Sequence, residues 1–170
     1  TIRNKADLLY VYPPDKQVEL CGDIQECIEG EHPSLAVVSS RFGKSASAAW
    51  IVQHLFNLSE FCGCKGKLSK SMLNELGFII ANEFYYLKVT ELMLFIYRFK
   101  LGDYGKFFGS VDPMVILSSL RQFVYWRNTQ IDHFDAERKL RQREEWAKTS
   151  ISREEYDKRI KSKENEKPKD

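Results

Sequence analysis

Residues 87–113 read LKVTELMLFIYRFKLGDYGKFFGSVDP, and this stretch decides the fold. Residues 92–97 are all apolar or aromatic, and the charged residues around them are too few to form a solvated helix face. A helix of this composition has to be surrounded by other elements. Gly102 is typical of a helix end, because glycine readily adopts the left-handed conformation. Asp112 and Pro113 predict the start of the next helix. An aspartate side chain can accept hydrogen bonds from the free amides of the first turn, and proline lacks the N–H group that would have no partner at the first helical position.

Length and composition are those of one helical domain with a real core. The chain has 170 residues, of which 43% are hydrophobic, and its formal charge is +2. This charge permits contact with phosphate or acidic partners, but it is far from the bias of a dedicated nucleic-acid binder. We find no signal peptide and no apolar run of the roughly 18 residues that a bilayer span requires. We therefore expect a soluble, cytoplasmic protein with no membrane partner.

The cysteines predict neither disulfides nor a metal site. They are Cys21, Cys27, Cys62 and Cys64. Their spacing lacks the pattern of a disulfide framework, so we expect reduced thiols. A zinc site would require Cys-x-x-Cys pairs or histidines at matching intervals, and neither is present. We expect no metal.

One short motif raises the possibility of nucleotide binding. Gly43-Lys44-Ser45 matches the end of a phosphate-binding loop, but Val38 stands where that motif requires a glycine. The end of one helix and the start of the next explain Gly43 equally well. No catalytic Ser-His-Asp order, H-E-x-x-H or Cys-x-x-Cys pattern is present. We therefore expect no cofactor and no enzymatic activity.

The remaining chain shows helical spacing almost throughout. Residues 1–14 are the exception, because an apolar run that ends at Pro13-Pro14 predicts an extended N-terminal arm. The spacing of apolar residues predicts helices over residues 15–29, 34–42, 44–61 and 69–85, and a long helix from Pro113. No proline or glycine pair forces a break near Tyr86, so helix 69–85 is expected to continue, straight or slightly bent, into the central segment.

The C-terminal segment is too charged to build a core. Residues 136–170 contain 12 lysines and arginines against nine acidic residues. Residues 152–155 match a capping box, which predicts a last solvated helix before residues 161–170 fray. The predicted fold is therefore all-α: a compact bundle of five or six helices over residues 15–135, with a projecting charged C-terminal helix and a frayed tail over residues 136–170.

Two charges on the central helix need partners if that helix is buried. Glu91 and Arg98 are seven residues apart and project from the same side. An unpaired buried charge is costly, so we favour a satisfied ion pair that fixes packing over a ligand-binding role.

The candidate interaction site is a cluster in which cations alternate with aromatic residues. Its members are Arg98, Lys100, Tyr104, Lys106, Phe107, Phe108, Arg121 and Arg127, with Tyr125 and Trp126 beside them. Such a cluster suits nucleic acid, because cations neutralise phosphates and rings stack on bases. It also suits a protein partner. In a third interpretation Tyr104, Phe107 and Phe108 fold under their loop and complete the core.

Residues 86–95, YLKVTELMLF, and 98–116, RFKLGDYGKFFGSVDPMVI, resemble a family of small uncharacterised proteins of Bacteroides-type bacteria, their phages and conjugative elements. The likeness extends back through Phe42-Gly43 and Ala49-Trp50, so it covers residues 34–127. The resemblance implies an accessory protein of a mobile element and brings no assigned activity. The combination of helical core, Gly-Tyr-Gly loop and charged tail is also similar to small phage replication accessories such as helicase loaders.

The functional hypothesis is a non-enzymatic interaction module of a phage or mobile element, an accessory of a replication-type nucleoprotein machine. It would contact this machine through residues 102–110 and the basic C-terminal helix, with a protein as the favoured partner and nucleic acid as the second choice. The alternative is a structural or assembly protein whose long helix from Pro113 self-associates through apolar residues: Phe123, Val124, Ile131 and Phe134.

Overall fold

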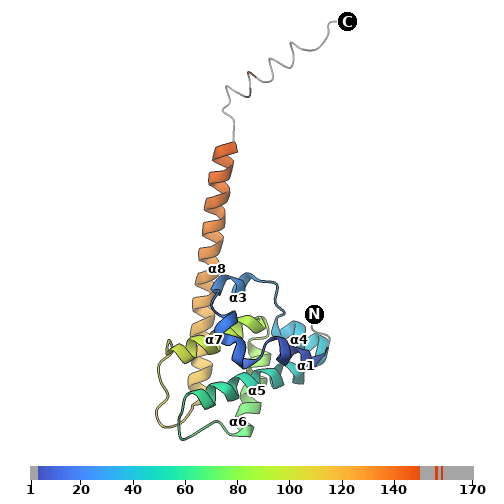
Figure 1. The fold of residues 1–170 in the computed structure, drawn as a ribbon, viewed down its shortest axis with the longest axis vertical. Coiled ribbons are helices and arrows are strands. Elements are labelled where there is room, and N and C mark those ends of the chain that lie inside the picture. Colours follow the sequence, from blue (N-terminus) through green and yellow to red (C-terminus); the bar gives the residue numbers. More distant parts are fainter. Residues whose placement is uncertain (1–3, 150–155, 157, 159–170) are drawn as a thin grey trace. The chain divides into compact units, whose positions relative to one another are not determined.

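A computed structural model describes residues 4–149, 156 and 158, and the chain in these ranges is helical (Figure 1). The elements are α1 (Lys5–Val11), the short 3₁₀ helix η1 (Pro14–Lys16), α2 (Gln17–Leu20), α3 (Ile24–Glu29), α4 (Leu35–Phe42), α5 (Lys44–Phe61), α6 (Lys70–Glu83), α7 (Val89–Leu101) and α8 (Pro113–Thr149). The described part contains no strand and only isolated β-bridges. The prediction of an all-α fold is confirmed.

The chain divides into two compact units, Thr1–Thr129 and Gln130–Asp170. Helix α8 begins in the first unit and ends in the second. The capping box predicted at residues 152–155 and the tail predicted over residues 161–170 lie outside the described residues. Over the described ranges, no helix combines the length and the apolar character that crossing a membrane requires.

Helix α7 is the buried centre of the first unit. Residues 89–96 are all buried, and α2, α3 and α5 pack around them. From α8, the ring of Phe123 packs on that of Phe95 with 5.7 Å between centroids. Burying a side chain of this size contributes about 2–3 kcal/mol to stability. The sequence prediction of a helix surrounded on all sides is confirmed.

The ends of α7 and α8 follow from local sequence. Gly102 ends α7 in the left-handed conformation, with φ of 93°. Asp112 precedes α8, and its side chain accepts a hydrogen bond from the Met114 amide at 2.7 Å. Both boundaries are as the sequence predicts.

Helices α4, α5 and α6 form a second layer of packing. Ser34 caps α4 by accepting a hydrogen bond from the Val37 amide at 3.2 Å, and α4 packs on α5. Helices α5 and α6 approach closely at Gly77, where a Cβ atom would lie 2.8 Å from Val52 and 3.0 Å from the Ala48 carbonyl oxygen. Glycine at this position allows the two backbones to come together.

The prediction of an extended N-terminal arm over residues 1–14 is wrong, because residues 5–11 of it form α1. The Asn4 side chain caps this helix by accepting hydrogen bonds from the Ala6 and Asp7 amides. Leu8 and Tyr12 are one helical turn apart and both are buried, so they attach α1 to the core. The prolines after Tyr12 end the helix, and this ending is what made the stretch resemble an arm.

Two further boundaries differ from the prediction. The helix expected over residues 15–29 is divided, because Asp23 caps a new helix by accepting a hydrogen bond from the Glu26 amide at 2.9 Å. Helix α6 does not continue into α7. The intervening chain bonds to the segment before α4 instead: the Leu35 amide donates to the Leu87 carbonyl at 2.8 Å, and the Val89 amide donates to the Pro33 carbonyl at 3.0 Å. These contacts with distant residues have no local sequence signal.

Candidate functional site

Residues 102–110 form a loop, which we call the aromatic loop, and its rings pack back on α7. Phe107 stacks on Phe99 with 5.1 Å between centroids and 14° between planes. Tyr104 packs against Phe95 and Phe99 with 5.5 Å and 5.6 Å between centroids. Tyr104 and Phe107 therefore pack against core residues of α7 and remain half-buried.

The far end of the aromatic loop is tied to the segment between α5 and α6. The Gly66 amide donates to the Gly109 carbonyl at 3.0 Å, and the Val111 amide donates to the Gly66 carbonyl at 2.8 Å. A Cβ atom at Gly66 would lie 2.6 Å from the Cβ of Ser110, so only glycine permits this approach. The loop is thus held at both ends.

Phe108 departs from its neighbours because its side chain is 92% exposed. The core interpretation is therefore wrong for this residue. Two other large apolar side chains nearby are also exposed, Leu101 by 63% and Phe61 by 60%. The spacing of α5 places Phe61 on the apolar stripe, but this residue lies in the last turn of that helix and remains accessible.

A cavity of about 300 Å³ lies between the aromatic loop and the ends of α5 and α7. Its lining residues are Phe61, Cys62, Phe99, Lys100, Leu101, Gly102, Gly105, Lys106 and Phe107. We call it the loop cavity. It combines three aromatic rings with two lysines and contains no carboxylate.

Lys100 is held in place by neutral partners. Its Nζ donates to Oε1 of Gln17 at 2.7 Å and to Oδ1 of Asn57 at 2.5 Å. The Phe61 ring lies 5.3 Å from the same Nζ. Burial lowers the pKa of Lys100. Among the described residues, no carboxylate forms an ion pair with this lysine.

The hydrogen bonds continue from Lys100 into the core through neutral groups. Gln17 is buried, and its Nε2 donates to Nδ1 of His54 at 2.8 Å. His54 Nε2 in turn donates to the Tyr12 carbonyl oxygen at 3.1 Å. Burial lowers the pKa of His54 to about 4, so this ring is neutral at neutral pH. Gln17 and Asn57 were not predicted, because they are 83 and 43 residues from Lys100 in sequence and carry no motif.

Two other cations of the predicted cluster, Arg98 and Arg127, have carboxylate partners. Glu91 is fully buried, and its Oε1 accepts a hydrogen bond from Nε of Arg127 at 2.5 Å. Its Oε2 accepts from the Lys88 amide at 2.7 Å. Glu91 and Arg98 therefore do not pair with each other, although each has an ion-pair partner, and the partner of Glu91 comes from α8.

Arg98 pairs instead with Asp103 at 2.9 Å and lies over the Trp126 ring, 3.7 Å from its centroid. The Tyr104 hydroxyl is buried beside this guanidinium, and burial raises its pKa. Neither Nε of Arg98 nor the Tyr104 hydroxyl makes a hydrogen bond of acceptable geometry. These residues stabilise the junction of α7, α8 and the loop.

The predicted cluster is therefore divided in space. Lys100, Lys106 and Phe107 line the loop cavity, and Phe108 extends from the same loop. Arg98, Tyr104 and Arg127 are half-buried in the packing, and Arg121 is exposed outside the cavity lining. Phe123, which the self-association hypothesis requires, is fully buried and unavailable to a second chain.

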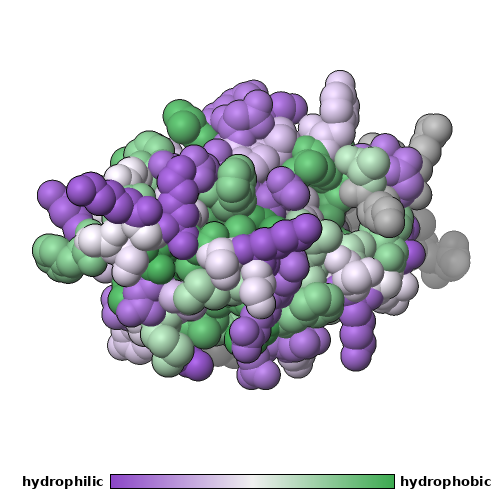
Figure 2. Space-filling model, turned by 90° about the horizontal axis from the view of Figure 1, so that it is seen from below, coloured by the Kyte–Doolittle hydropathy of each residue, from purple (hydrophilic) through white to green (hydrophobic). Residues whose placement is uncertain are grey.

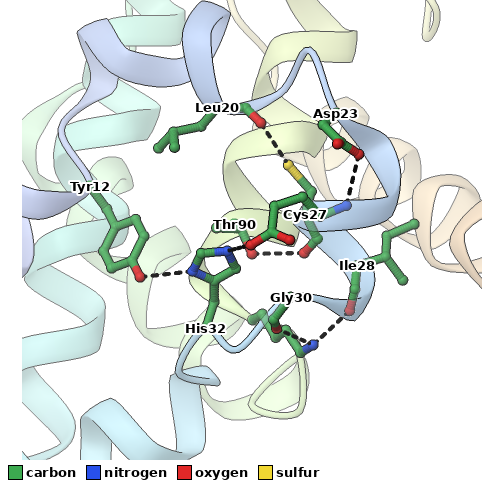
Figure 3. Close-up of polar contacts among 10 residues, drawn as sticks. Tyr12, Leu20, Asp23, Cys27, Ile28, Gly30, His32 and Thr90 are labelled. Atoms are coloured by element: carbon green, nitrogen blue, oxygen red, sulfur yellow. Dashed lines mark hydrogen bonds and ion pairs between the residues drawn. The ribbon is translucent and has the colours of Figure 1, made fainter.

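A second polar network holds α1 and α3 against α7 (Figure 3). The Tyr12 hydroxyl lies 3.0 Å from Nδ1 of His32, and Nε2 of His32 lies 3.1 Å from Oε1 of Glu26. A carboxylate accepts only, so Nε2 carries the proton and Tyr12 donates to Nδ1. The Thr90 hydroxyl donates to the Cys27 carbonyl at 2.7 Å. Burial raises the pKa of Tyr12. These contacts connect elements and explain why they pack here.

The network borders a larger cavity of about 570 Å³, which differs from the loop cavity in charge. Its lining residues are Val11, Tyr12, Glu31, His32, Pro33, Val37, Val38, Arg41 and Phe42. It contains one carboxylate and one guanidinium, so its charge favours no ligand of either sign. In the described ranges no three His, Cys, Asp or Glu side chains form a group suited to a metal ion.

Figure 2 shows the face that lies lowest in Figure 1, where the aromatic loop and the segment between α5 and α6 are found. Hydrophobic side chains appear there between long hydrophilic ones and do not merge into one wide apolar surface. Apolar side chains scattered in this way are ordinary on a protein surface.

Comparison with known proteins places the chain in a family. The model of a family of unknown function (DUF6633) matches residues 67–167, which include α6, α7, the aromatic loop and all of α8. No curated protein and no solved structure matches the chain.

Proposed function

The chain belongs to the family of unknown function DUF6633, and we propose that it is a non-enzymatic helical interaction module that binds a protein partner through the aromatic loop. In this proposal the protein is an accessory of a nucleoprotein machine of a phage or mobile element. That genetic setting derives from the resemblance carried by residues 86–116.

The observation that carries the proposal is the exposure of Phe108 on a loop of fixed shape. The loop is held by the Phe99–Phe107 stack at one side and by the hydrogen bonds of Gly66 at the other. An isolated exposed apolar residue is common on proteins. Here the ring is 92% exposed, two residues from Lys106, on a loop held at both ends, so a partner can bind it without first ordering the loop.

The arrangement of rings favours a protein over nucleic acid. Single strands bind by stacking successive bases on several free ring faces along a cationic groove. In the aromatic loop only Phe108 is fully available, because Tyr104 and Phe107 pack on α7. One protruding aromatic residue with flanking apolar and cationic side chains is instead the composition of a protein interface anchor.

The test is enrichment of partners from source cells with the full-length protein and with the double variant Phe108→Ser, Lys106→Ala. The variant should keep the circular dichroism spectrum of the native protein and lose a specific partner. Met114→Ser is the matched control, because Met114 is 70% exposed but lies outside the loop and should keep that partner.

A folded double variant that retains every partner of the native protein would contradict the proposal. The second arm measures binding of single-stranded and duplex DNA across a salt series. Affinity that falls steeply with salt and disappears in the double variant would assign the loop to nucleic acid instead.

A further inference from the structure

The loop cavity has an uncompensated charge. It is lined by Lys100 and Lys106 and by no Asp or Glu side chain. Glu60 and Asp103 adjoin lining residues in sequence, but they pair with other cations: Glu60 with Lys67 at 2.6 Å and Asp103 with Arg98 at 2.9 Å. A cavity with two cations and no internal anion favours an anionic ligand.

Lys100 is positioned to donate to such a ligand. An ammonium group has three N–H donors, and two of them are used by Gln17 and Asn57. Both acceptors are neutral amides, which orient the ammonium without cancelling its charge. The third donor has no acceptor among the described residues, and Lys100 itself lines the cavity.

Size and lining restrict the ligand further. A volume of about 300 Å³ is at the lower limit for ligand sites and accommodates one or two side chains. The rings of Phe61, Phe99 and Phe107 give it apolar walls. An anionic side chain next to an apolar one matches this combination.

On these grounds, and resting on the proposed function, we propose that the loop cavity binds the carboxylate of an Asp or Glu side chain in an acidic, apolar segment of the protein partner. Lys100 is the anchoring cation and Lys106 the second one. The lining contains no arginine, whereas sites for phosphorylated segments use arginine clusters. Two lysines in one cavity also do not form the row of cations that tracks a nucleic-acid backbone.

The experiment is a titration of the full-length protein, followed by nuclear magnetic resonance, with two isosteric probes: N-acetyl-Asp-Phe-amide and N-acetyl-Asn-Phe-amide. We expect the Asp probe to shift signals of Lys100, Gly105 and Phe107 with millimolar affinity. The Asn probe should bind about tenfold more weakly, because it lacks the charge-assisted hydrogen bond. This pair tests the charge of the ligand without altering the protein.

Protein variants give an independent readout. Lys100→Gln and Lys106→Gln should each reduce binding of the Asp probe and leave that of the Asn probe nearly unchanged. Lys139→Gln removes the same charge from an exposed lysine outside the cavity and should change neither. If Lys100→Gln fails to fold, the probe pair and Lys106→Gln still decide the question.

Equal responses to both probes, or no response at the highest soluble concentration, would overturn the inference. Shifts of the same signals by oligothymidylate without any by the Asp probe would also overturn it and identify a nucleic-acid site. Partner loss in the Phe108 double variant with no response to the Asp probe would leave the proposed function standing while this inference fails. The reverse pattern would reject partner binding through Phe108 and leave the loop cavity as a carboxylate site without that partner.

Discussion

Arg127 and Lys100 belong to the same compact unit and both are held by hydrogen bonds, but their partners differ in charge. The Arg127 guanidinium pairs with Glu91, a carboxylate with no exposed surface. The Lys100 ammonium is held by the side-chain oxygens of Gln17 and Asn57, which carry no charge. The first cation neutralises a buried charge, and the second retains its own at the wall of a cavity.

This difference divides the cations of a cluster that looks uniform in sequence into two kinds, those paired with carboxylates and those held by neutral groups. A buried carboxylate without its cation would be severely destabilising, so Arg127 has a structural task within the fold. A half-buried lysine without a carboxylate has its pKa lowered by burial and gains nothing from an internal ion pair. The protein tolerates that cost, as the proposed binding of an anionic ligand by Lys100 requires.

The largest expected effect on stability comes from breaking the ion pair between Arg127 and Glu91. Arg127→Met leaves Glu91 charged and buried, and the free energy of unfolding should fall by about 3–5 kcal/mol. Urea denaturation followed by circular dichroism measures this loss. The double variant Glu91→Gln, Arg127→Met removes both charges and should recover most of the stability. A double variant as unstable as the single one would show that packing, not charge, makes Arg127 necessary.

The second prediction concerns His54, which is connected to Lys100 by hydrogen bonds through Gln17 and should be neutral in the folded protein. The pKa of His54 in the folded protein is about 4, below the ordinary histidine value of 6.5, so the unfolded chain binds the extra proton more readily. Burial of neutral His54 therefore makes the free energy of unfolding depend on pH. Its contribution to stability is fully present above pH 6.5, and up to about 3 kcal/mol of it is lost as the pH falls to 4.

Denaturation midpoints measured from pH 7 to 4 test this slope. His54→Gln keeps a donor for the Tyr12 carbonyl and an acceptor for Gln17, so its stability should vary less with pH. His133→Gln changes an exposed histidine and should leave the slope as it is. An unchanged slope in His54→Gln would mean that His54 is not the buried neutral group that the structure places beside Gln17.

The third prediction concerns the support of the aromatic loop. Gly66→Ala would bring a Cβ atom to 2.6 Å from Ser110, so the loop must move, at a cost of about 1–3 kcal/mol. Hydrogen exchange should accelerate at the Val111 amide, whose acceptor is the Gly66 carbonyl. Gly22→Ala is the control, because its nearest contact would lie at an ordinary 3.7 Å. Unchanged protection at Val111 would show that this glycine does not anchor the loop.

The smallest effect on stability is expected for a lysine of the loop cavity, Lys106. Lys106→Met removes an exposed cation that has no carboxylate partner among the described residues, so the urea midpoint should not change measurably. Arg127→Met under the same conditions provides the contrast. A clear destabilisation by Lys106→Met would show that this lysine has a structural partner. It would then not differ from Arg127 in the way described above.

Sequence patterns predicted the elements whose signals are local. The apolar run at residues 92–97 predicted a surrounded helix, and Ser34, Gly102 and Asp112 correctly marked helix boundaries. Predictions failed where distant contacts decided the outcome. The chain between α6 and α7 bonds to the segment before α4, and Tyr12 attaches α1 to α5 through its carbonyl oxygen. No spacing in the sequence encodes those contacts.

For the candidate site, sequence alone determined which residue types occur together: cations and aromatic rings around a glycine-rich loop. Only the tertiary structure decided their roles. In the folded protein Arg98 and Arg127 pair with carboxylates, whereas Lys100 donates hydrogen bonds to Gln17 and Asn57. The physical reason is that helical periodicity fixes the direction of a side chain on its own helix, whereas an ion pair or a cavity depends on which other helices pack there.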